Sequence, residues 1–333
     1  MIRIGRIASI ALLAAFAAAY SGFAQQQVPP APPQGAAAPQ APSAPSPSGP
    51  PTLPKPDPKN FTATTPTKET VSAFLQTTWG FDDNRMWEVA AILKTPVDGL
   101  SKVIVYVGDK TGKEKPGSVM FWALPDGKHI IAGDEVIPFG EHPYAAYRSR
   151  LQQQANGPYR GSAAKDLELV EFADFQCPHC KDAQANMEKL VADFPKAHIV
   201  FQNYPLERLH PQAKLAAEYA VCVTKAGGSS AFFQFASAVF DAQDGLSTAD
   251  GATLTLNSAV TKAGLDPAKV GACAALPATS DEVEKSVTLA QDLNINQTPT
   301  LVINGRQVPV GGVPYETIKK VVEYQAKQDG VSQ

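Results

Sequence analysis

The sequence has little of what marks several large classes of protein. Its formal net charge is only −3 over 333 residues. No stripe of basic residues is interleaved with aromatic ones, so nucleic acid is not an expected partner. No apolar run of membrane length follows residue 24. Cysteine is scarce: the chain has four, all beyond residue 170, so any cysteine chemistry belongs to the second half of the chain.

Residues 1–24 have the pattern of a secretory signal peptide. Arg3 and Arg6 give a positively charged start, an apolar stretch spans 7–20, and small residues follow. The alternative is a retained N-terminal anchor, which so short an apolar run favours less. We expect an exported protein, periplasmic or otherwise, in a compartment where disulfides form.

Residues 25–59 are rich in proline and contain no aromatic residue. They hold 13 of the 29 prolines of the chain, mixed with alanine, glutamine, serine and glycine. Such a segment cannot bury enough apolar surface to offset the entropy lost on ordering. It is predicted to be a disordered linker, stiffened by polyproline II stretches, that acts as a spacer.

Residues 60–140 are predicted to form a small α+β domain. A short helix is expected over 66–76, with Thr65 as its N-cap. The turn signal Asp126-Gly127 predicts a hairpin between the last two of four strands. These strands are rich in valine and isoleucine and are expected at 87–93, 102–108, 118–124 and 128–131.

Residues 141–160 are predicted to form a linker helix, because most of them favour helices and the segment ends near Gly157-Pro158. The domain at 161–330 then has the order strand, helix, strand, helical block, strand, strand, helix. This order fits an α/β fold with a mixed sheet and a helical insertion. His210 is interpreted as part of the start of the helical block rather than as a ligand. The expected bounds are 167–175, 181–194, 198–203, 211–292, 300–304, 307–310 and 314–327.

The run FADFQCPHCKD at 172–182 places Cys177 and Cys180 with two residues between them. A haem anchor needs a histidine directly after the second cysteine, where Lys181 stands. A zinc site needs four ligands, and there is no second such pair. A purely structural disulfide over this spacing would be strained. The pair is therefore predicted to be a redox dithiol that uses no metal and no other cofactor.

The residues around the first cysteine point to an acidic thiol. Cys177 falls at a strand-to-helix junction, where the free N–H groups and the dipole of the helix favour a thiolate. Pro178 takes the first helical position, where its missing N–H does no harm. His179 adds a donor and, when protonated, a cation beside the sulfur. The helix end and His179 both lower the pKa of Cys177, so the pair is predicted to be oxidising.

Two further segments are predicted to complete the site. Glu171 stands in the strand before the dithiol, on the face opposite its apolar neighbours. A buried carboxyl there would have a raised pKa and could pass a proton to or from Cys180; an exposed strand residue is the alternative. Thr298 and Pro299 open a later strand. A cis bond there would present the backbone of Thr298 to an extended client peptide; an ordinary trans proline is the alternative.

These motifs resemble the thioredoxin-fold disulfide oxidoreductases of the DsbA type. The resemblance rests on FQCPHC after a Val-Glu-Phe strand and on Thr-Pro-Thr before a Leu-Val-Ile-Asn-Gly strand. It covers residues 160–330 and implies a thioredoxin-like fold. It further implies that Glu171 is the buried acid, Pro299 the cis-proline, and 211–292 the inserted helical domain.

The domain at 60–140 resembles a different family, the N-terminal dimerisation domain of the DsbC and DsbG isomerases. The matching runs are PVDGL at 96–100 and DGKHIIAG at 126–133. This resemblance implies a homodimer formed through the N-terminal domain. The chain therefore combines an isomerase-like architecture with an oxidase-like dithiol, and the direction of electron flow stays open.

Cys222 and Cys273 stand alone in the predicted helical block. In an exported protein, two such cysteines most simply pair as a structural disulfide, closing a loop of about 50 residues. A relay or regulatory disulfide is the alternative.

Together these features predict an exported thiol:disulfide oxidoreductase or isomerase that forms or rearranges disulfides in client proteins. A client would form a mixed disulfide at Cys177, and Cys180 would resolve it. The expected partners are exported clients with thiols or disulfides, a membrane redox partner, and a second copy of the chain. The alternatives are a dimeric isomerase or reductase and, from another class, a non-catalytic tethered holdase.

Overall fold

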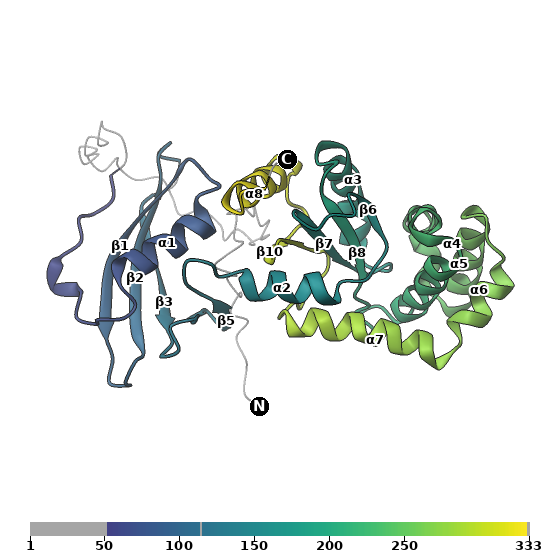
Figure 1. The fold of residues 1–333 in the computed structure, drawn as a ribbon, viewed down its shortest axis with the longest axis horizontal. Helices are drawn as coiled ribbons and strands as arrows, with labels where there is room; N and C mark the ends of the chain where they lie inside the picture. Colours follow the sequence, from purple (N-terminus) through teal and green to yellow (C-terminus); the bar gives the residue numbers. More distant parts are fainter. Residues whose placement is uncertain (1–51, 114, 332–333) are drawn as a thin grey trace, which may run out of the picture. The chain divides into compact units, whose positions relative to one another are not determined.

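The computed structural model describes residues 52–113 and 115–331, which fall into two units. The first unit runs to Leu75 and resumes at Asp83–Phe139, and the second comprises Gln76–Asp82 and the chain from Gly140 onward. Each unit contains one five-stranded sheet (Figure 1). The predicted signal peptide at 1–24 and most of the predicted linker at 25–59 lie outside the described residues.

The first unit is an antiparallel sheet with one main helix, α1 (Lys68–Trp79), and strand order β1-β2-β3-β4-β5. The ring of Phe74 in α1 lies 6.3 Å from that of Phe121 and 4.9 Å from that of Phe139, so the helix packs on the sheet through aromatic side chains. The strands are β1 (Arg85–Lys94), β2 (Ser101–Asp109), β3 (Gly117–Ala123), β4 (His129–Ala132) and β5 (Glu135–Pro138).

Two details of the first unit differ from the sequence prediction, and a third agrees with it. The N-cap of α1 is Thr67, whose hydroxyl accepts from the N–H of Thr70, and not Thr65. Strand β5 was missed because it is short, exposed and ends in proline, which suits only an edge strand. The hairpin at Asp126-Gly127 is present, with Gly127 at φ +67° and β3 paired to β4.

The end of the predicted linker has structure. Pro58–Asn60 form a short 3₁₀ helix, η1, capped by Asp57, whose carboxylate accepts from the N–H of Lys59. Phe61 then pairs with Ile92 of β1 as an isolated bridge. The prediction of disorder through residue 59 is therefore wrong at its C-terminal end, because these residues find backbone partners that composition alone does not reveal.

The sheet of the second unit is mixed, with strand order β10-β9-β7-β8-β6. The central strand β7 runs parallel to β8 and antiparallel to β9, and the edge strands β6 and β10 are antiparallel to their neighbours. The strands are β6 (Tyr159–Gly161), β7 (Glu168–Ala173), β8 (His198–Asn203), β9 (Thr300–Ile303) and β10 (Arg306–Pro309).

Helices cover both faces of this sheet (Figure 1). On one face, α3 (Pro178–Asp193) and α8 (Tyr315–Gln328) pack against Leu169 and Leu301. On the other face, α2 (Ala145–Gln154) and α7 (Pro277–Asp292) pack against Val170, Phe172 and Val302. Because β7 is covered on both sides, all six of its residues are buried.

The chain between β8 and β9 forms the helical insertion: α4 (Ala213–Asp241), η2 (Gln243–Ser247), α5 (Ala249–Lys262), α6 (Pro267–Ala274) and α7. Gly228 interrupts α4 with φ +68°, a conformation that glycine adopts readily. Phe175, just after β7, packs among Phe232, Phe235 and Phe240, with ring centroids between 5.2 and 6.3 Å apart. The insertion therefore shares its core with the loop that follows β7.

Two predictions for the second unit need correction. The predicted linker helix over 141–160 is only α2 (Ala145–Gln154), because Tyr159–Gly161 leaves it to pair with β8 as an edge strand. Residues 76–82, predicted as part of the N-terminal domain, belong to the second unit. The buried guanidinium of Arg306 donates to the carbonyl oxygens of Thr77 and Thr78, and this contact ties the end of α1 to β10.

Candidate active site

The dithiol lies where the central strand meets a helix. Cys177 is the N-cap of α3, with extended backbone angles of φ −75° and ψ 122°, and Pro178 is the first helical residue. Cys180 follows in the first turn, and both thiols are free. The helix begins three residues earlier than predicted, because Pro178 has the φ that a first helical turn requires.

The Cys177 thiol is held in an acidic state. The thiol of Cys180 is the largest cause: by donating to the sulfur of Cys177, it lowers the pKa of Cys177 to about 5. Burial raises this pKa in part, and the backbone N–H groups of Cys180 and His179, at the N-terminus of α3, lower it further. At neutral pH, Cys177 is therefore a thiolate and a good leaving group.

Thr298 lies against the same sulfur, although 121 residues separate it from Cys177 in sequence. The Cys177 thiol donates to the carbonyl oxygen of Thr298 over 3.6 Å. The Thr298 hydroxyl is buried with no hydrogen-bond partner among the described residues, so it is free to donate to the thiolate, and this lowers the pKa of Cys177. The Thr298–Pro299 peptide bond is cis.

The thiol of Cys180 has a raised pKa, in contrast to that of Cys177. It is fully buried, and burial followed by its hydrogen bond to Cys177 raises the pKa of the Cys180 thiol. The backbone N–H of Asp174 donates to its sulfur over 3.4 Å. The two sulfurs therefore differ strongly in acidity, and Cys180 holds its proton while Cys177 releases one.

Glu171 is a buried carboxyl on the face of β7 that α3 covers. Only 2% of its surface is exposed, and burial raises its pKa to about 7. The amide of Gln184 in α3 donates both to Oε1 of Glu171 (2.9 Å) and to the carbonyl oxygen of Cys180 (3.1 Å). This single amide therefore contacts both the carboxyl of Glu171 and the backbone of Cys180.

His179 contributes through its backbone. Its side chain is exposed on the first turn of α3, and the group that lowers the pKa of Cys177 is its N–H. The sequence prediction assigned that effect to the imidazole, as a donor and a cation. The imidazole role stays a prediction.

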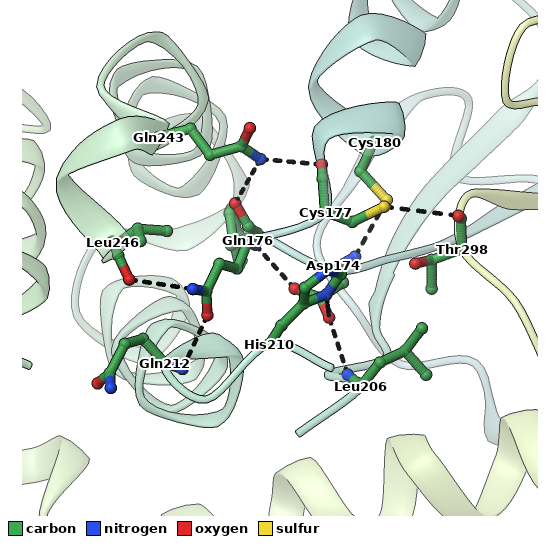
Figure 2. A network of polar contacts seen from close by, with 11 residues as sticks. Asp174, Gln176, Cys177, Cys180, Leu206, His210, Gln212, Gln243, Leu246 and Thr298 are labelled. Atoms are coloured by element: carbon green, nitrogen blue, oxygen red, sulfur yellow. Dashed lines mark hydrogen bonds and ion pairs between the residues drawn. The ribbon is translucent and has the colours of Figure 1, made fainter. Parts of the chain in front are cut away.

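A polar network behind the dithiol was missed by the sequence analysis (Figure 2). The buried carboxylate of Asp174 accepts from the N–H groups of Gln176 (2.7 Å) and Leu206 (2.8 Å) and from Nδ1 of His210 (2.8 Å). His210, interpreted from the sequence as part of a helix start, is thus a hydrogen-bond partner of Asp174. A polar residue directly after the buried strand, three positions before Cys177, was the one available signal for Asp174.

Two glutamines extend this network into the insertion. Nε2 of Gln243 in η2 donates to the carbonyl oxygens of Phe175 and Cys177. Gln176 donates to the carbonyl oxygen of Leu246 and accepts from the N–H of Gln212. Nothing in the sequence connects Gln243 with a site 66 residues away.

The other two cysteines form a disulfide inside the insertion. Cys222 in α4 and Cys273 in α6 are bonded, 51 residues apart in sequence, with Cα atoms separated by 5.9 Å. The hydroxyl of Thr279 lies 3.7 Å from the sulfur of Cys222. This disulfide joins α4 to α6, and both of its cysteines lie more than 40 residues after Cys180 in the sequence.

The fold and the paired thiols are those of a thioredoxin-like domain. A mixed sheet centred on β7 carries a Cys-x-x-Cys at the start of α3, and a helical insertion separates β8 from β9. Residues 153–324 match the family model described as thioredoxin, and the chain belongs to the thioredoxin family. The thioredoxin-like fold predicted from the motifs is confirmed, and the resemblance to the DsbA type stays a prediction.

Several curated proteins are similar to part of the chain. The Na(+)/H(+) antiporter NhaA 3 of Salinispora tropica is 29% identical over 148 residues, which is 44% of this chain and 22% of that protein. The Na(+)/H(+) antiporter NhaA 1 of Mycolicibacterium vanbaalenii is 31% identical over 153 residues, 44% of this chain and 23% of that protein. The chain thus spans less than a quarter of the length of these relatives.

Solved structures are also similar to about half of the chain. A thioredoxin-like oxidoreductase from Silicibacter pomeroyi is 26% identical, covering 54% of this chain and 98% of that chain with a TM-score of 0.46. DsbA2 of Pseudomonas aeruginosa is 26% identical, with 52% and 96% covered and a TM-score of 0.44. Oxidised BdbD of Bacillus subtilis is 23% identical, with 53% and 95% covered and a TM-score of 0.44.

Two features are absent from the described residues. Within 52–113 and 115–331, no helix is both long and apolar enough to cross a membrane. In the same part of the chain, no group of three or more His, Cys, Asp or Glu side chains is arranged to hold a metal ion.

Proposed function

We propose that the protein is an exported thiol:disulfide oxidase that transfers the Cys177–Cys180 disulfide to client proteins. The observation that carries this proposal is the contrast within the dithiol: the pKa of Cys177 is lowered to about 5, whereas that of Cys180 is raised. A stabilised thiolate favours the reduced form of the enzyme, so the oxidised form readily gives its disulfide away. Export is supported by the disulfide between Cys222 and Cys273, a bond typical of oxidising compartments.

The reaction proceeds in two exchanges. A client thiolate attacks the sulfur of Cys177 in the oxidised enzyme; a mixed disulfide forms, and Cys180 leaves and takes up a proton. A second client thiolate then attacks the client sulfur of the mixed disulfide, and Cys177 leaves as a stable thiolate. The client loses two electrons and the dithiol gains them. A redox partner, which we place in the membrane, restores the enzyme disulfide by the reverse exchanges.

Glu171 serves the first exchange. Cys180 leaves as a buried sulfur and needs a proton, because burial disfavours its thiolate. With a pKa of about 7, Glu171 is able to hold that proton near neutral pH and to release it to Cys180. The shared contacts of Gln184 support this assignment, since they hold Glu171 close to the residue it serves.

Client binding is assigned to the segment that begins at Thr298. Its backbone lies beside the sulfur of Cys177, and an extended client chain pairing with it would bring a client sulfur to Cys177. Pro299 has no backbone N–H, so it cannot donate a hydrogen bond to the client chain.

A second candidate is a dimeric isomerase, favoured by one observation. The first unit is a separate five-stranded antiparallel sheet with its own core, as a dimerisation domain requires. Light scattering of the mature chain is the measurement that separates the two candidates. A monomer would rule out the isomerase, and a dimer that reshuffles a scrambled client faster than it oxidises a reduced one would favour it.

A trapping experiment tests the oxidoreductase mechanism. In Cys180→Ser, the mixed disulfide at Cys177 has no resolving thiol, so covalent adducts with a disulfide-containing client should accumulate and disappear on addition of dithiothreitol. Cys177→Ser is the matched control, because the remaining thiol is buried and of raised pKa and should form few adducts. The absence of adducts in Cys180→Ser would contradict the mechanism.

A further inference from the structure

The loop before the dithiol is attached to the helical insertion by two glutamine side chains that reach in opposite directions (Figure 2). From the insertion, Nε2 of Gln243 donates to the carbonyl oxygens of Phe175 and Cys177, each over 2.9 Å. Both hydrogens of this amide are thereby used on the backbone of one short loop. Gln243 is only 8% exposed, so neither bond competes freely with water.

From the loop, Gln176 reaches back to the insertion. Its Nε2 donates to the carbonyl oxygen of Leu246 over 3.0 Å, and its Oε1 accepts from the N–H of Gln212 over 2.8 Å. Leu246 belongs to η2 and Gln212 is the N-cap position of α4. All four partners of the two glutamines are backbone groups, so the arrangement depends on the paths of the two segments rather than on the side chains they carry.

The carbonyl oxygen of Cys177, which Gln243 contacts, belongs to the residue that carries the reactive sulfur. It also accepts from the N–H groups of Cys180 (3.1 Å) and Lys181 (3.3 Å), which close the first turn of α3. The N–H groups of Cys180 and His179 in that turn lower the pKa of Cys177, in addition to the larger effects of the Cys180 thiol and the Thr298 side chain. A shift of this carbonyl changes the direction of the first turn, and with it the distance from those N–H groups to the sulfur.

We propose that Gln176 and Gln243 form a clasp through which the helical insertion positions the active-site loop and keeps the N-terminus of α3 directed at the Cys177 sulfur. The two glutamines are positioning residues, since they act through the backbone of Cys177 and touch no reacting atom. The proposal rests on the exchange reaction proposed above. It assigns the insertion a role in setting the oxidising strength of the dithiol.

The test uses Gln243→Met in the full chain. Methionine fills a similar volume and donates no hydrogen bond, so the carbonyls of Phe175 and Cys177 lose this partner. The titration of Cys177 is followed by the ultraviolet absorbance of its thiolate. We expect its midpoint to rise by about one pH unit. The equilibrium with glutathione should shift several-fold toward the enzyme disulfide, which makes the enzyme a weaker oxidant.

Two further variants make the outcome specific. Gln176→Met removes the opposite half of the clasp at a half-buried site and should shift the Cys177 midpoint in the same direction. Gln202→Met is the matched control: Gln202 is 3% exposed and donates to Ser286. It should cost comparable stability and leave the Cys177 midpoint unchanged, because the side chain of Gln202 in β8 contacts Ser286 in α7 and the N–H of Gly157, and neither belongs to the active-site loop.

The results separate the clasp from the proposed function. If folded Gln243→Met keeps the wild-type midpoint, or if Gln202→Met shifts the midpoint equally, the clasp is overturned. If Gln243→Met does not fold, Gln176→Met decides, and an unchanged midpoint there overturns the proposal. A wild-type midpoint near that of free cysteine, about 8.5, would instead overturn the proposed oxidase.

Discussion

The second unit contains two cysteine pairs in two different regions, and the contrast between them shows what makes a sulfur reactive. In the active-site loop, Cys177 and Cys180 are free thiols within the first turn of a helix. In the helical insertion, Cys222 and Cys273 are bonded across 51 residues of chain. The side chains are identical, so the difference lies in the groups around each sulfur and in the length of chain that each bond closes.

The two pairs also differ in their positions along the helices. Cys177 lies at a helix N-terminus, where the N–H groups of His179 and Cys180 lower the pKa of its thiol. Cys222 lies in the interior of α4, where the backbone N–H groups bond to carbonyls one turn earlier. Its sulfur is therefore placed to stabilise the fold and not to carry a thiolate.

The largest effect that tests this contrast is loss of the insertion disulfide. The double variant Cys222→Ala and Cys273→Ala should lower the free energy of unfolding by about 4 kcal/mol, because the unfolded chain regains the entropy of an open loop of this length. Urea unfolding, followed by circular dichroism, measures this. The Cys177 titration should stay as in the wild type, and a shift there would mean that the two pairs are coupled.

The second effect concerns Glu171, whose acidity changes on folding. Burial raises its pKa from 4.5 to about 7, so the folded state binds its proton more tightly than the unfolded state does. The contribution of this proton to the free energy of unfolding is fully present below pH 4.5 and is lost as the pH rises through 7. Over that window, wild-type stability should fall by about 3 kcal/mol from this group, and Glu171→Gln should remove the fall.

The unfolding measurements on Glu171→Gln are made on the disulfide form. Reduced Cys177 titrates in the opposite sense, since its pKa is lowered on folding, and it would mask the effect. Glu168→Gln is the control: Glu168 is equally buried in β7 but lies on the other face and pairs with Lys165. It shows what loss of another buried carboxyl of β7 does to the pH profile. If Glu171→Gln keeps the wild-type pH profile, the proton assignment is wrong.

The smallest effect is expected at His179. If its imidazole acts as a cation beside the sulfur, His179→Ala should raise the Cys177 midpoint by less than about one pH unit, because the exposed charge is screened by solvent. His179→Gln keeps a donor without a charge and separates the two contributions. An unchanged midpoint in both variants would leave the backbone N–H as the whole contribution of this residue.

Much of the active site around Cys177 could be predicted from the sequence, because its residues are close together in the chain. Cys177, Pro178 and Cys180 lie within four residues, and the change from strand to helix around them follows from the hydrophobic pattern and from proline. The face of β7 that carries Glu171 follows from strand alternation. The sequence did not predict β5 and β6, because both are short edge strands with weak local signals and are defined by their pairing with β4 and β8.

The paired thiols, the thioredoxin-like fold and the block of helices between β8 and β9 could thus be predicted from residue patterns alone. The groups that surround the sulfurs could not, because they come together only in the folded chain. Thr298 beside Cys177, His210 on Asp174, and Gln243 on the Cys177 carbonyl join segments between 36 and 121 residues apart. No propensity or spacing encodes such contacts. They arise when the whole chain packs, because buried backbone and side-chain polar groups must then find partners that water no longer supplies.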